Sequence, residues 1–225
     1  EISGTVGITV FPDDGNDVQT LLKNADIAMY KAKQAGKNRF QFYSPEMHVE
    51  VQTRMQLEAD LRRAIAEKLF VLHYQPIVDS SSGELVGTEA LIRWNHPERG
   101  IVYPDEFISV AEECGLIVQI GEWVIREATK QWHFWLTQGY PPLRLAVNVS
   151  SVQFRERNLP QLVVDLLAQY KMKPDCLTLE ITESVLFESN NETESYLREI
   201  KEIGVSYALD DFGTGYSSLS YLKRF

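Results

Sequence analysis

Carboxylate and amide side chains recur along this chain, each at the downstream end of a short apolar run. They are Glu89, Asn148, Glu180 and the adjacent pair Asp210 and Asp211. The spacing from Asn148 to Glu180 and from there to Asp210 is about 30 residues, the length of a strand–helix–strand unit. Side chains at the carboxyl ends of successive parallel strands converge on one face. Carboxylate and amide oxygens are the ligands of hard divalent cations, so the pattern predicts a metal site.

Taken singly, most of these residues also have ordinary structural explanations. Glu89 and Arg93 share one face of a strand, where they could bind a metal and a phosphate oxygen, or form a solvated ion pair. Asn148 could be a turn residue that ends a strand. Glu183 could be an acid in the first turn of a helix. These alternatives stay open for each residue taken alone.

The stretch from Asp210 to Ser218 is the most specific part of the sequence. Two adjacent carboxylates repel each other unless a cation lies beside them. Gly213 and Gly215 permit a tight backbone after them. An ordinary turn capped by Asp is the competing interpretation, but an apolar strand precedes the pair and matching acids lie upstream. The histidines show no ligand spacing, and no Ser-His-Asp or Cys-His arrangement stands out.

Composition limits the classes of partner. The net charge of −10 disfavours a nucleic acid polymer or an anionic membrane surface, although bound cations would still admit a small anionic ligand. No apolar run approaches the roughly 20 residues of a membrane span. Cys114 and Cys176 lack a paired spacing, which predicts two free, buried thiols in a reducing, cytoplasmic setting. A membrane-anchored parent protein remains compatible with this piece.

The first third of the chain predicts the end of an α/β domain followed by a connector. Residues 5–11 alternate like a strand, residues 18–35 have a helical apolar face, and residues 39–43 form a second short strand. Residues 47–68 form a polar helix with a narrow apolar stripe, which favours a connection between two domains.

The rest of the chain predicts a mostly parallel sheet, open or closed into a barrel. Two strands joined by a short turn, 69–78 and 85–94, must be antiparallel. Helices and strands then alternate. The expected segments are helices 104–114 and 118–136, strand 144–149, helix 159–170, strand 177–182, helix 192–203 and strand 205–210. A full (β/α)₈ barrel needs about 250 residues, so a barrel starting at residue 69 would lack its last third.

Several separated motifs, in order, resemble the EAL family of bacterial cyclic-di-GMP phosphodiesterases from about Leu57 to Phe225. They are Tyr74-Gln75-Pro76-Ile77, Glu89-Ala90-Leu91-Ile92-Arg93-Trp94, His96-Pro97, Pro104-Asp105-Glu106-Phe107-Ile108, Asn148-Val149-Ser150, Glu180-Ile181-Thr182-Glu183 and the stretch 210–218. Residues 1–46 resemble the C-terminal end of a GGDEF, diguanylate cyclase-type domain, on the strength of residues 24–38. Residues 47–68 would then be the connector and residues 69–225 the truncated EAL domain.

The EAL resemblance implies a TIM-like barrel with an antiparallel first strand, and hydrolysis of cyclic-di-GMP to linear pGpG with two Mg²⁺ or Mn²⁺ ions. Glu89, Asn148, Glu180 and Asp210 would hold one ion, and Asp211 would help to hold the second. Glu183 would order the loop after the aspartate pair. Gln75, Leu91 and Arg93 would line the substrate site. The resemblance also allows a homodimer through the EAL domain.

Part of the family pattern lies beyond Phe225, including the catalytic lysine and further metal ligands. The second metal site is therefore expected to be incomplete here, the parent protein to be the enzyme, and the isolated piece to be inactive. The alternative is an inactive EAL module that binds cyclic-di-GMP or a protein partner as a sensor. The intact motif residues favour the enzyme.

Overall fold

A computed structural model of the chain describes residues 3–156, 158–182 and 191–210, with side chains from residue 195 onward in the last range. The chain divides into two compact units, residues 1–60 and 61–225. Within the described ranges, no helix combines the length and the apolar character that crossing a membrane requires.

The first unit is a small α/β structure. Strands β1 (Val6–Ile8) and β2 (Phe40–Phe42) are parallel and are connected through helix α1 (Val18–Gln34). Asp17 caps α1 by accepting a hydrogen bond from the Thr20 backbone N–H at 2.9 Å. The helix lies directly against β1, because a Cβ added at Gly7 would come within 1.9 Å of the Ala25 carbonyl oxygen. Helix α2 (Pro45–Glu67) begins in this unit and ends in the second.

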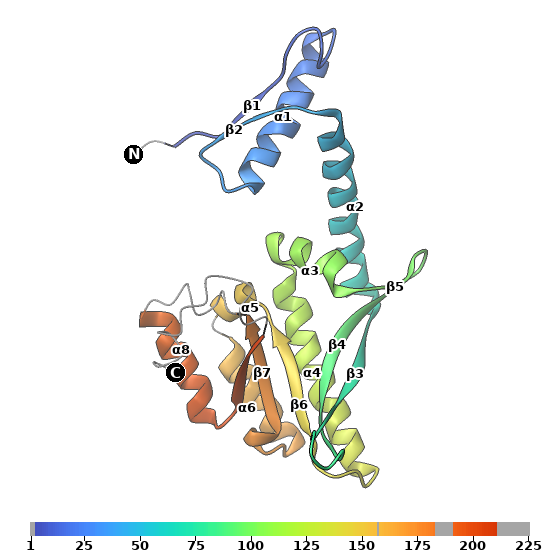
Figure 1. Cartoon of the computed structure of the whole chain (residues 1–225), viewed down its shortest axis with the longest axis vertical. Helices are drawn as coiled ribbons and strands as arrows, with labels where there is room; N and C mark the ends of the chain where they lie inside the picture. Colours follow the sequence, from blue (N-terminus) through green and yellow to red (C-terminus); the bar gives the residue numbers. More distant parts are fainter. Residues whose placement is uncertain (1–2, 157, 183–190, 211–225) are drawn as a thin grey trace. The chain divides into compact units, whose positions relative to one another are not determined.

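The second unit is built on one sheet, with strand order β3-β4-β6-β7-β8 and β5 paired with β4 (Figure 1). Strands β3 and β4 are antiparallel, whereas the β4–β6, β6–β7 and β7–β8 pairs are parallel. This confirms the α/β class with an antiparallel first strand. The strands are β3 (Phe70–Val78), β4 (Leu85–His96), β5 (Gly100–Val102), β6 (Arg144–Val149), β7 (Leu177–Thr182) and β8 (Ser206–Asp210).

The turn between β3 and β4 is closed by Asp79. Its carboxylate accepts hydrogen bonds from the backbone N–H groups of Ser81 and Ser82, both at 2.9 Å. The Ser81 hydroxyl and these N–H groups lower the pKa of Asp79 to about 2. A local side-chain turn therefore fixes the hairpin that carries Glu89.

Helices connect the parallel strands and pack together as a layer. Helix α4 contacts strands β3, β4 and β6 as well as helices α3, α5 and α6, and α6 contacts α8. The helical elements are α3 (Pro104–Glu113), α4 (Ile117–Thr137), α5 (Ser151–Arg155), α6 (Leu159–Tyr170), the 3₁₀ helix η1 (Pro174–Cys176) and α8 (Asn191–Ile203).

Apolar side chains on the helix-covered side of the sheet form the core. Leu145 and Val147 of β6, and Leu179 and Ile181 of β7, are at most 1% exposed. An aromatic cluster lies near the C-terminal end of β4. It consists of Phe70, Trp94, Phe107 and Trp123, whose ring centres are 5.8 to 6.1 Å apart in four pairs. Burial of these surfaces is the main source of stability in this unit.

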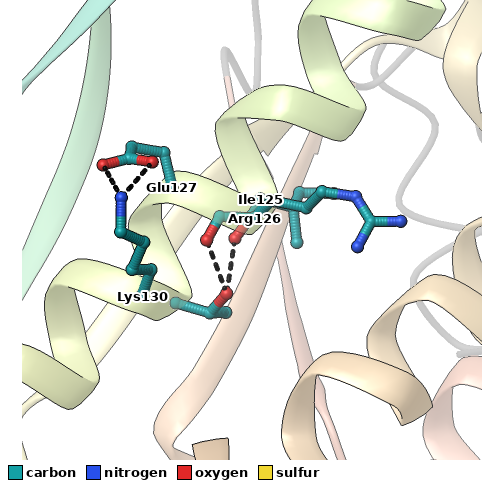
Figure 2. A network of polar contacts seen from close by, with 5 residues as sticks. Ile125, Arg126, Glu127 and Lys130 are labelled. Carbon is teal, nitrogen blue, oxygen red and sulfur yellow. Dashed lines mark hydrogen bonds and ion pairs between the residues drawn. The ribbon is translucent and has the colours of Figure 1, made fainter. Parts of the chain in front are cut away.

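Helix α4 has one buried and one solvated side. Thr129 is fully buried, and its hydroxyl donates a hydrogen bond shared between the carbonyl oxygens of Ile125 and Arg126. On the exposed side, Lys130 pairs with Glu127 (Figure 2). Gly121 faces the adjoining α5, because a Cβ there would come within 2.0 Å of Gln153 Oε1. The helix thus seats closely on the element that follows β6.

The segments predicted from periodicity agree with the observed helices and strands to within a few residues, but three short elements were missed. These are β5, α5 and η1, none longer than five residues. The two cysteines are free, as predicted, but half-buried rather than buried. The predicted domain boundaries at residues 46 and 68 stay predictions.

Candidate functional site

The register of the sheet places the predicted site residues on one face. Glu89 lies opposite Ala146, Asn148 opposite Glu180, and Asp210 opposite Thr182. Paired residues point to the same side and side chains alternate along a strand. One face of the sheet therefore carries all four side chains, those of Glu89, Asn148, Glu180 and Asp210. It lies opposite the side on which the helices pack, and we call it the open face.

Two of these side chains are joined by a hydrogen bond across the sheet. Asn148 Nδ2 donates to Glu89 Oε1 at 2.7 Å, although 59 residues separate them in the sequence. Asn148 and Asp210 are exposed, whereas Glu89 and Glu180 are half-buried.

Glu180 stands in an excess of negative charge. Burial, the charges of Glu89 and Asp210, and a hydrogen bond with Glu89 raise the pKa of Glu180 to about 7. A carboxyl group in this setting holds a proton near neutral pH. A cation that displaced the proton would relieve the same repulsion.

The donor set suits a hard divalent cation in its chemistry. It offers three carboxylates and one amide oxygen, the ligand types that Mg²⁺ and Mn²⁺ prefer. In the part of the chain that the structure describes, no three His, Cys, Asp or Glu side chains are drawn together tightly enough to hold an ion. The carboxyl groups instead interact with one another, so the side chains would have to reorient to coordinate a metal.

A cavity of about 340 Å³ adjoins this cluster. Leu91, Asn148 and Asp210 line one part of it, and apolar residues of α3 and α4 such as Ile108 and Ile120 line another. Apolar walls with a few polar groups are typical of sites for small organic ligands. Leu91 is thus where a substrate-lining residue is expected.

The other predicted substrate residues lie close by on the hairpin. Gln75 of β3 is directly opposite Glu89. Arg93 donates to the Ile92 carbonyl oxygen at 2.7 Å, and its guanidinium carbon lies 4.9 Å from the centre of the Tyr103 ring. Sequence reasoning missed Tyr103, which no motif marks. Glu183 and Asp211 lie outside the described residues.

Two family models match the chain. The EAL domain model matches residues 58–225, and the diguanylate cyclase, GGDEF domain model matches residues 1–39. The chain is 44% identical over 223 residues to the bifunctional diguanylate cyclase/cyclic di-GMP phosphodiesterase MucR of Pseudomonas aeruginosa, covering 99% of this chain and 33% of that protein. It is 40% identical to the cyclic di-GMP phosphodiesterase PdeR of Escherichia coli K12, with 99% and 33% coverage. The chain therefore spans about a third of these curated relatives.

Solved structures show the same likeness. The PaMucR phosphodiesterase in complex with c-di-GMP matches with a TM-score of 0.71 and 45% identity, over 76% of this chain and 69% of that chain. The Xanthomonas citri FimX EAL domain in complex with c-diGMP matches with a TM-score of 0.68 and 25% identity, over 79% and 69%. These likenesses confirm the predicted barrel-type architecture of the second unit.

Proposed function

We propose that this chain, which belongs to the EAL domain family, is part of an enzyme that hydrolyses cyclic-di-GMP to linear pGpG in bacterial second-messenger signalling. One observation carries the proposal: Glu89, Asn148, Glu180 and Asp210 gather on one face of the sheet, with Asn148 bonded to Glu89, beside a cavity. Relatives described as cyclic di-GMP phosphodiesterases support the substrate.

Divalent ions, Mg²⁺ or Mn²⁺, are the proposed cofactors. Glu89, Asn148, Glu180 and Asp210 would hold one ion, and Asp211 would contribute to a second site that is incomplete in this stretch. When bound, the ions would supply an activated water and stabilise negative charge on the phosphate. The raised pKa of Glu180 is consistent with this assignment, because burial and the nearby charges of Glu89 and Asp210 disfavour its ionised form, which a bound cation would stabilise.

The remaining roles belong to the chain's own side chains. Arg93 would bind a phosphate oxygen through its guanidinium, which is held by Ile92 and Tyr103. Leu91 and the apolar part of the cavity would contact a base, while the Gln75 amide would donate or accept a hydrogen bond beside it. Glu183 would position the loop after Asp210.

The decisive experiment measures cyclic-di-GMP turnover by the full-length protein with Mn²⁺, comparing the wild type with Glu89→Ala. Glu127→Ala is a matched control, because it removes a glutamate from the exposed side of α4. We expect turnover in the wild type and the control only. Equal rates in all three proteins would contradict the metal role of Glu89.

A second candidate is a module that binds cyclic-di-GMP without hydrolysing it and relays the bound state through α2. The Xanthomonas citri FimX EAL domain, solved in complex with c-diGMP, supports binding of this dinucleotide as the property that both candidates share. Calorimetry separates the two: micromolar or tighter binding in Mn²⁺ with no pGpG formed would establish the sensor.

We further propose a cytoplasmic location and a homodimer through the EAL domain. The free, half-buried thiols of Cys114 and Cys176 fit a reducing compartment. Sedimentation of the full-length protein at several concentrations tests the dimer.

A further inference from the structure

A contact between α3 and the end of β6 lies next to the candidate site. The Ser150 hydroxyl donates to Glu112 Oε1 at 2.7 Å, across 38 residues of sequence. Glu112 is in the last turn of α3, and Ser150 directly follows β6. Both residues line the cavity that adjoins Asn148.

The Ser150 hydroxyl acts as a hydrogen-bond donor and as an acceptor at the same time. While its proton goes to Glu112, its Oγ accepts a hydrogen bond from the Val152 backbone N–H at 3.1 Å and so caps α5. A hydroxyl has one proton to donate, so the carboxylate fixes its direction. The residue two positions after Asn148 is therefore tied to α3 and to α5.

The end of β6 needs such a restraint. On the β7 side the pairing continues through Val149, but on the β4 side it ends at the pair of Ala90 with Val147. Asn148 thus lies past the last residue that β4 holds, and its side chain is exposed. Backbone pairing alone fixes this position from one side only.

We propose that Glu112 is a positioning residue: through Ser150 it holds the end of β6 so that the Asn148 amide faces Glu89 and the divalent ion. This inference rests on the proposed function, because it assumes that Asn148 binds a metal there. In this role Glu112 acts through Ser150 and is not itself a ligand of the ion. Outer residues that orient metal ligands typically change metal affinity by about 10- to 100-fold.

The test measures Mn²⁺ affinity of the full-length protein by electron paramagnetic resonance, without substrate. Glu112→Ala should weaken Mn²⁺ binding about 10-fold. Glu112→Gln should stay within about threefold of the wild type, because its amide oxygen still accepts the Ser150 proton. Glu106→Ala is the matched control, since it removes an acid from the first turn of the same helix, where the residue pairs with Arg99; it should leave the affinity unchanged.

Melting temperatures measured on the same proteins separate positioning from general support. If Glu112→Ala lowers the melting temperature but leaves Mn²⁺ affinity at the wild-type value, the proposal is wrong. It is also wrong if Gln weakens binding as much as Ala, since charge would then be the cause. If Glu112→Ala fails to fold, Ser150→Gly carries the same test, because glycine is tolerated as a helix cap but lacks the hydroxyl.

Glu89→Ala distinguishes this inference from the proposed function. If Glu89→Ala keeps full Mn²⁺ affinity, the metal site itself is misassigned and the inference falls with it. If Glu89→Ala loses Mn²⁺ binding while Glu112→Ala does not, only the positioning role is refuted.

Discussion

The two faces of the sheet in the second unit differ in burial and in the kind of side chain that they carry. On the covered face, Val147 and Leu179 are buried against helices. On the open face, the neighbouring residues Asn148 and Glu180 are exposed and half-buried, respectively. Because side chains alternate along β6 and β7, each short strand serves both faces with different residues. The chain can therefore keep its stability and its chemistry on separate side chains of one strand.

The two faces also differ in the sign of their contribution to stability. Burying a leucine contributes about 1.5 to 3 kcal/mol. On the open face, burial and the charges of Glu89 and Asp210 raise the pKa of Glu180, so its ionised form opposes folding. Changes on the covered face should therefore act on folding, whereas changes on the open face should act on ligands and on the pH dependence of stability.

The largest expected effect is on the open face. Glu89→Ala should lower cyclic-di-GMP turnover by the full-length protein at least about 1,000-fold, equivalent to about 4 kcal/mol in the barrier. Its melting temperature should change little, because Glu89 is not part of the core. A large fall in melting temperature would break the separation of the two faces.

On the covered face, Leu179→Ala should reduce the free energy of unfolding by about 2 to 5 kcal/mol, because it leaves a cavity at a position that is 1% exposed. Denaturant unfolding measures this value. Thr178, the preceding and half-buried residue, supplies the control: Thr178→Ala should cost much less. A loss below 1 kcal/mol for Leu179→Ala would show that this face is loosely packed.

The seam between α4 and α5 should be sensitive to added volume. Gly121→Ala should destabilise the fold by about 1 to 3 kcal/mol, although alanine is the better helix former, because the new Cβ would collide with Gln153. Combining it with Gln153→Ala should recover part of the loss. Stabilisation by Gly121→Ala alone would mean that the Gln153 side chain moves aside at no cost.

The charge on the open face predicts a pH dependence. The pKa of Glu180 rises from 4.5 in an ordinary setting to about 7 in the folded chain, so the folded state binds more protons in this interval. Stability should therefore fall as pH rises from about 4.5 to 7 without divalent ions. Glu180→Gln should flatten this slope in denaturant unfolding. An identical slope in wild type and variant would remove Glu180 as its source.

The smallest effect belongs to the solvated side of α4. Glu127→Ala removes the exposed ion pair with Lys130 (Figure 2) and should change the free energy of unfolding by at most about 0.5 kcal/mol. Raising the salt concentration should shrink even this difference. A change above 1 kcal/mol would assign the pair a structural role.

Much of the fold could be predicted from the sequence, because long helices and strands have clear periodicity. The regular spacing of Asn148, Glu180 and Asp210 predicted parallel strands, and the short turn at Asp79 predicted the antiparallel hairpin. The elements that escaped prediction, β5, α5 and η1, have three to five residues, too few for a period to repeat.

The candidate site was predictable in its placement but not in its contacts. The convergence of strand ends predicted that Glu89 and Asn148 lie on one face, yet the hydrogen bond between them depends on the register between strands whose bonded residues are 59 positions apart. The Glu112–Ser150 contact likewise needs α3 to lie beside the end of β6. Such contacts between distant residues leave no pattern in a single sequence.

The tight β3–β4 hairpin has a consequence for how the molecule is made. Its strands pair across one short turn, so little loop entropy is lost in forming it, whereas the β6–β7 pairing must close a crossover of about 30 residues. During synthesis, Gln75 and Glu89 can thus meet before Asn148 has been translated. The strands of the site are synthesised in the order β3 and β4, then β6, then β7 and β8, so each later strand can pair with one that was made before it.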